Sequence, residues 1–240
     1  IGQQFTQNVL GYDTLLAAAV VVPSAVCTAV FGQIAGRLVA ARGSRVSFVL
    51  GLSSVALAFA VMLFAWRDGA AIGWVLLAYA LVGTGVGLAA TPASRSLMSS
   101  VPPARGGMGS AFLDLTRDFG GAIMQALMGT LLAFAYAQQM RGDLASLPSS
   151  EAAQVSSDAS AQLVSSYEGA AAVARDYPAH ADTIVTAAAE ACSHGKSLAI
   201  GVALVLTLGG LLLVVLRYPR KDDEEAYYER VAAEQTATAS

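Results

Sequence analysis

Charged residues are scarce in this sequence. Asp, Glu, Lys and Arg make up only 13% of its 240 residues, while hydrophobic residues make up 55%. A soluble domain usually carries about 25% charged residues. This shortage indicates that lipid is the main solvent of the chain. The net charge of -3 also gives no bulk electrostatic reason to expect nucleic acid as a partner.

Cysteines and catalytic motifs are equally sparse. Cys27 lies inside an apolar run and Cys192 beside a polar one, so the two predict neither a disulfide framework nor a metal site. The sequence contains no serine-elbow pattern, and no carboxylates on two apolar runs that could clamp a metal. We therefore expect a protein that is not an enzyme and that binds no metal or other cofactor.

Long apolar runs dominate the sequence instead. Five of them lack any Asp, Glu, Lys or Arg, and each holds at least 19 residues, which as a helix extends about 28 Å. That length is close to the ~30 Å hydrocarbon core of a bilayer. The sequence therefore predicts an all-α integral membrane fold. The five runs are 15–35, 46–66, 70–93, 119–137 and 198–216.

The N-terminal residues suggest a sixth span. The chain begins with Ile1 rather than Met, and "IGQQFTQNVLGYD" is typical of the outer tip of a helix. We therefore expect a piece of a longer protein, with five complete spans plus the end of a sixth.

Basic residues predict the orientation of these spans. Nine bases lie in the junctions after the first and third spans and in the tail, against four in the alternate junctions. The side that is richer in Lys and Arg is normally cytoplasmic. We therefore expect a multi-pass protein of the plasma membrane with a cytoplasmic C-terminus. The predicted regions are a transmembrane bundle (1–137), an Ala/Ser-rich extracytoplasmic insert (138–196), a last transmembrane helix (197–217) and a cytoplasmic tail (218–240).

Small residues and a proline mark helix packing within the spans. Gly83, Gly87 and Thr91 follow a small-xxx-small rhythm, which lets the backbones of two membrane helices approach closely. A hinge at which helices slide is the alternative interpretation. Pro23 lies within the first predicted span, where proline commonly marks a kink.

A charged cluster precedes the fourth span. Asp114, Arg117 and Asp118 are spaced to share one face of a helix. Charges facing lipid at mid-depth cost about 2.5 to 3.5 kcal/mol each. Since the span needs only residues 119–137, the cluster is expected at the cytoplasmic rim. The cluster could equally be the solvated end of a helix, where acids complement the helix dipole.

Gln125 is the polar residue that this second interpretation does not explain. It stands within the fourth span, with Gly121 and Gly129 one turn away on either side. A polar side chain at that depth should face protein or a wet cavity. We therefore expect Gln125 to line a cavity, with the two glycines serving packing or hinge motion.

Three segments together carry a family resemblance: "QQFTQNVLGYDTLLAAAVVVP", "GRLVAARGSR" and "SSVPPARGGMGSAFLDLTRDFGGAI". In their order and spacing they resemble the carboxy-terminal half of the fourteen-span drug/proton antiporters of the major facilitator superfamily, as found in actinobacterial multidrug efflux pumps. The resemblance implies a carboxy-terminal helical bundle that rocks against an amino-terminal one. It runs from Gln3 to about Thr130 and resumes loosely at the last span.

The resemblance also implies roles for residues. "GRLVAARGSR" looks like the superfamily's cytoplasmic gating loop, but Ala40 stands where that pattern expects Asp. Asp114, Arg117 and Asp118 would belong to a latch between the two halves or take part in proton coupling. The residues that match the gating loop are Gly36, Leu38, Gly43 and Arg45.

These observations together predict a secondary active transporter. The expected activity is proton-coupled export of hydrophobic drugs or lipid-like compounds by alternating access, with the proton gradient as its energy source. The expected partners are the amino-terminal half of the same transporter, small hydrophobic substrates and membrane lipids, with no nucleic acid. The main proton carriers are expected in that other half. The alternative is a transporter-derived membrane scaffold or sensor that does not transport.

Overall fold

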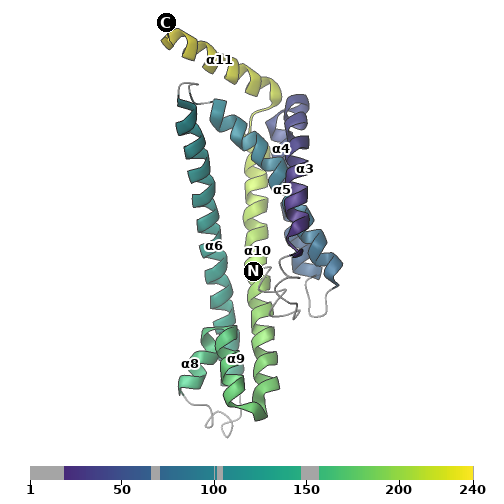
Figure 1. The fold of residues 1–240 in the computed structure, drawn as a ribbon, viewed down its shortest axis with the longest axis vertical. Helices are drawn as coiled ribbons and strands as arrows, with labels where there is room; N and C mark the ends of the chain where they lie inside the picture. The colour runs from purple at the N-terminus through teal and green to yellow at the C-terminus, as the bar shows by residue number, and fades with distance from the viewer. Residues whose placement is uncertain (1–18, 66–70, 100, 102–104, 147–156, 240) are drawn as a thin grey trace. The chain divides into compact units, whose positions relative to one another are not determined.

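The computed structural model describes residues 19–65, 71–99, 101, 105–146 and 157–239. Over these residues every regular element is a helix, as the sequence predicted (Figure 1). The helices are α3 (Val22–Arg42), α4 (Ser44–Ala65), α5 (Ile72–Ser99), α6 (Gly106–Ala145), α8 (Ser157–Ser165), α9 (Tyr167–Asp176), the 3₁₀ helix η3 (Pro178–His180), α10 (Ala181–Arg217) and α11 (Lys221–Ala239).

Five of these helices are long and apolar enough to cross a membrane: α3, α4, α5, α6 and α10. They correspond to the five predicted spans, and the chain is an all-α, multi-pass membrane protein. Two helices are longer than a bilayer requires, with 40 residues in α6 and 37 in α10. As a result, both boundaries of the predicted insert, at residues 138 and 197, lie inside continuous helices.

The chain divides into two compact units, which are described separately. The bundle unit contains α3, α4, α5, the first half of α6, the end of α10 and α11. The insert unit runs from Met124 to Ala203, and so contains the second half of α6, α8, α9, η3 and the first part of α10.

Helix α5 is the centre of the bundle unit, since it packs along both α3 and α4 (Figure 1). Its glycines permit this close packing. A Cβ atom on Gly83 would overlap the backbone of Ser24 in α3, and one on Gly87 would lie 2.7 Å from the Thr28 carbonyl oxygen. On the side of α4, a Cβ atom on Gly85 would lie 2.6 Å from the Gly51 carbonyl oxygen. Any larger residue at these positions of α5 would push a neighbouring helix away.

Hydroxyl groups supplement this packing with hydrogen bonds between helices. Pro92 lies inside α5, where it has no N–H to donate to the carbonyl of Leu88. The Ser47 hydroxyl of α4 donates to that carbonyl at 2.7 Å instead. Both Ser47 and Pro92 are fully buried. The bundle therefore satisfies, from a neighbouring helix, the backbone acceptor that its internal proline leaves free.

Pro23, whose place inside a longer apolar run predicted a kink, stands in the first turn of α3. Residues 20 and 21 form a turn directly before that helix. Since the first N–H groups of a helix have no intrahelical acceptor, proline is well tolerated at this position. The residues before 19 lie outside the described part of the chain.

The insert unit has a small core of its own. Tyr136 and Met140 on the extension of α6 pack with Leu163 of α8 and Val173 of α9. The Tyr136 hydroxyl donates to the Leu163 carbonyl at 3.0 Å. Figure 1 shows α8 and α9 beside this end of α6. The insert is therefore a folded helical unit built on the ends of two membrane helices.

Candidate functional site

The charged cluster of α6 is exposed. Asp114, Arg117 and Asp118 all have exposed side chains. In the part of the chain that the structure describes, no ion pair forms between them. Helical spacing places them within about one turn of each other. The three charges are thus available to a partner outside the described residues.

Gln125 continues this exposed surface along α6. Its side chain is exposed, and a Cβ atom added to Gly121 or to Gly129 would meet no atom of the described residues within 4 Å. The apolar residues Phe119 and Ile123 are also 65% and 50% exposed. The middle of α6 therefore presents one polar side chain, two open glycines and large apolar groups, a composition that suits a cavity wall or a helix interface.

The α3–α4 junction is the second candidate site. Here the chain turns between two helices at Gly43, whose φ of 85° lies in the left-handed region that favours glycine. Gly36 is exposed with open space around it, and Leu38 is half-buried. Arg45 donates from Nη2 to the carbonyl of Val215 near the end of α10. The four residues that match the gating loop therefore lie on α3, at the turn and on α4.

The tail packs on this junction, which the sequence did not predict. The backbone N–H of Ser44 donates to Oε2 of Glu224 in α11 at 3.0 Å. Tyr218, between α10 and α11, shares a hydrogen bond of 2.7 Å with Ser96 at the end of α5. Burial raises the pKa of the Tyr218 phenol above its ordinary value. A run of acids at the start of a helix, "KDDEE", was the available signal, but it does not identify which helix receives the carboxylate.

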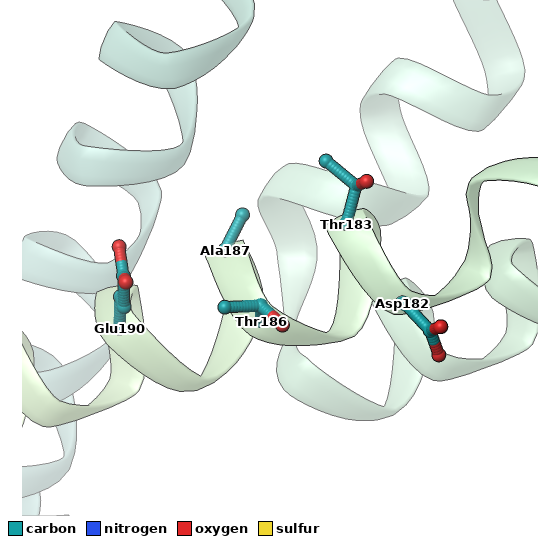
Figure 2. A pocket seen from close by; sticks show the side chains of 5 residues that line it. All are labelled: Asp182, Thr183, Thr186, Ala187 and Glu190. Atoms are coloured by element: carbon teal, nitrogen blue, oxygen red, sulfur yellow. The ribbon is translucent and has the colours of Figure 1, made fainter.

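The insert unit has a surface pocket along α10. Figure 2 shows its lining side chains, with the carboxylates of Asp182 and Glu190 pointing in different directions. The other lining residues are Thr183, Thr186 and Ala187. Over the described residues no three His, Cys, Asp or Glu side chains gather in a way that could hold a metal ion. This pocket lacks the converging polar groups of a specific ligand site.

The sequence pattern described as Major Facilitator Superfamily matches residues 3–125, slightly more than half of the chain. The chain belongs to the Major Facilitator Superfamily. The matched segment covers α3, α4, α5 and the first half of α6, and it ends at Gln125. The charged cluster, Gln125 and the α3–α4 junction lie within it, whereas Gly129, helices α8 and α9 and the tail helix α11 lie outside it.

Relatives within the superfamily carry names that refer to export. The chain is 33% identical over 130 residues to the multidrug resistance protein Stp of Mycobacterium tuberculosis, which covers 54% of this chain and 24% of that protein. It is 26% identical over 218 residues to the multidrug efflux pump LfrA of Mycolicibacterium smegmatis, covering 90% and 41% respectively. It is also 33% identical over 126 residues to the cephamycin export protein CmcT of Amycolatopsis lactamdurans, covering 52% and 26%. The chain spans less than half the length of these relatives.

Proposed function

We propose that the chain supplies the carboxy-terminal half of a proton-coupled exporter of hydrophobic drugs or lipid-like compounds. The observation that carries this proposal is the similarity, over 90% of the chain, to a protein named as a multidrug efflux pump. The exposed middle of α6 supports it, because a half-transporter needs one helix face that is left open for the substrate and for the other half.

In this proposal the protein lies in the plasma membrane with its tail in the cytoplasm and the insert outside. Gln125 lines the central cavity, where its amide orients substrates that otherwise bind through apolar contact. Asp114, Arg117 and Asp118 form a latch with the amino-terminal half or assist proton coupling. Their exposure and lack of an ion pair among the described residues support a partner in that half.

The proposal is tested with the full-length protein in inverted membrane vesicles. In such vesicles an exporter should move a lipophilic cationic dye into the vesicle lumen when a pH gradient is applied, and an uncoupler should abolish this accumulation. Vesicles that carry no transporter provide the control. Dye uptake that ignores the gradient would argue against proton coupling, and absence of uptake for a panel of dyes, antibiotics and lipid analogues would overturn the export function.

A second candidate is a membrane scaffold or sensor that does not transport. The packed core of the insert favours it, since a folded external unit can bind a ligand or partner. Deletion of residues 147–176 distinguishes the two. An exporter should keep gradient-driven uptake after the deletion. A sensor should show no uptake with or without these residues, and should lose its response to the ligand or partner when they are removed.

A further inference from the structure

The first turn of α4 receives its cap from a distant part of the chain. Helices leave their first N–H groups without an intrahelical acceptor, and the preceding residue often supplies one with its side chain. Gly43 has no side chain to do so. The Glu224 carboxylate, 180 positions away, accepts from both the backbone N–H and the hydroxyl of Ser44. An anion at this position also complements the positive end of the α4 dipole.

The opposite contact runs from α4 back to the end of α10. Arg45 donates to the carbonyl of Val215, which lies in the last turn of α10 and has no N–H partner further along that helix. Cations are favourable at this negative end of a helix. The junction and the tail thus cap each other: Glu224 caps the start of α4, and Arg45 caps the end of α10.

Further contacts from the tail surround these two caps. The Lys221 ammonium donates to the Ala41 carbonyl at 3.4 Å. Tyr228 donates to Oε1 of Glu224 at 3.2 Å, and its ring lies 5.4 Å from the Arg95 guanidinium. Contacts on both sides of Gly43 and at the end of α5 fix α11 against the bundle, so Glu224 is not a mobile surface acid.

Glu224 is set apart from the other acids of the tail by its burial. It is 4% exposed and its partner Ser44 is 0% exposed. Asp223, Glu225 and Glu229 on the same helix are all exposed. Where side-chain burial is described, no other acid is buried. A charge-assisted hydrogen bond in such a dry place is stronger than one at the surface.

We propose that the tail and the α3–α4 junction form a tail clamp. In this clamp Glu224 of α11 acts as a positioning residue that fixes the junction for the conformational step of transport. The tail clamp comprises Ser44, Arg45, Val215, Lys221 and Glu224. Its role in transport rests on the proposed function. The contact between tail and junction is independent of that function and is measured separately.

Hydrogen exchange in the full-length protein tests the contact. In Glu224→Ala the amides at the start of α4, residues 44–48, should exchange about tenfold faster than in the unmodified protein, because the acceptor of the Ser44 N–H is gone. Glu229→Ala, which removes an exposed acid from the same helix, should leave this exchange unchanged. Glu224→Gln keeps a carbonyl acceptor and should fall between the two, and it serves as the test if Glu224→Ala does not fold.

Transport kinetics test the role. Glu224→Ala should lower the maximal rate of gradient-driven dye uptake about threefold or more, with KM changed less than about twofold, because the clamp lies away from the substrate. Glu224→Asp should restore part of the rate. Equal exchange at residues 44–48 in the Glu224→Ala and Glu229→Ala proteins would overturn the clamp. Faster exchange with an unchanged rate would overturn its role in transport. If the unmodified protein takes up no dye, the proposed function fails, while the exchange result still decides the contact.

Discussion

Helices α5 and α6 carry glycines in opposite surroundings. Gly83 and Gly87 of α5 lie against the backbone of α3, whereas Gly121 and Gly129 of α6 have open space where a side chain would be. The sequence treats the two pairs alike, since both are small residues spaced by whole turns of a membrane helix. Glycine spacing therefore marks a surface suited to close approach, and only the three-dimensional packing shows whether this chain itself fills that surface.

The polar groups of the two helices differ in the same way. On α5, backbone carbonyls accept hydrogen bonds from neighbouring helices of the bundle unit. The carbonyl of Leu88 accepts from the Ser47 hydroxyl, and that of Gly83 accepts from the Thr28 hydroxyl at 3.1 Å. On α6, Asp118 and Gln125 are exposed. Helix α5 therefore holds the bundle unit together, and the exposed part of α6 from Asp114 to Gln125 is where substitutions should alter function with little change in stability.

The largest expected effect is on α5. Gly83→Ala places a methyl group on the backbone of Ser24 and should lower the free energy of unfolding by about 3 kcal/mol. Gly121→Ala is the matched control, because its methyl group enters open space and alanine favours helix; we expect a gain of up to about 1 kcal/mol. Thermal unfolding of the purified full-length protein in detergent measures both. Equal destabilisation by the two substitutions would remove the distinction between the helices.

A smaller loss is expected at the internal proline. Ser47→Ala leaves the carbonyl of Leu88 buried without a donor, which should cost about 2 kcal/mol of stability. Ser54→Ala is the control, since Ser54 also donates from α4 to a carbonyl of α5, at 2.8 Å. That carbonyl belongs to Leu81, which can still accept from the N–H four residues on. The same thermal measurement should give Ser54→Ala less than half the effect, and a reversed order would contradict the role assigned to Ser47.

The sequence predicted the helical spans because each is a run of at least 19 residues without charge, a property of the local chain alone. It did not predict the contact of Glu224 with Ser44, because a hydrogen bond between residues 180 positions apart leaves no periodic trace. The core of the insert was missed for another reason. Its small residues, such as Ala170 and Ala188, are equally typical of a solvated Ala/Ser-rich segment.

The roles of the α6 residues remain predictions. Asp114, Arg117, Asp118 and Gln125 were selected for charge or polarity next to or inside an apolar run, and the structure places all four on an exposed surface. Their function depends on what covers that surface. In the proposed function that surface belongs to the amino-terminal half, and neither sequence pattern nor packing of these 240 residues identifies it.

A substitution on α6 should separate function from stability. Asp118→Asn removes one exposed charge of the proposed latch and should slow gradient-driven dye uptake about tenfold, equal to about 1.4 kcal/mol. The free energy of unfolding should change by less than about 0.5 kcal/mol, as is usual for surface positions. Asp158→Asn, an exposed acid of α8, is the control and should leave uptake unchanged. Normal uptake by the Asp118→Asn protein would remove this residue from the latch.

The smallest effect is expected at Gln125. Gln125→Leu keeps the helix and the approximate side-chain size but removes an amide from the proposed cavity wall. Substrates that accept or donate hydrogen bonds should lose about threefold in uptake relative to purely apolar ones, the size expected for one neutral hydrogen bond. Gln138→Leu, an exposed position further along α6, is the control. Because the ratio of polar to apolar substrates cancels any change in protein amount, an unchanged ratio would place Gln125 outside the cavity, and the glycines around it would then differ from those of α5 only in the open space beside them.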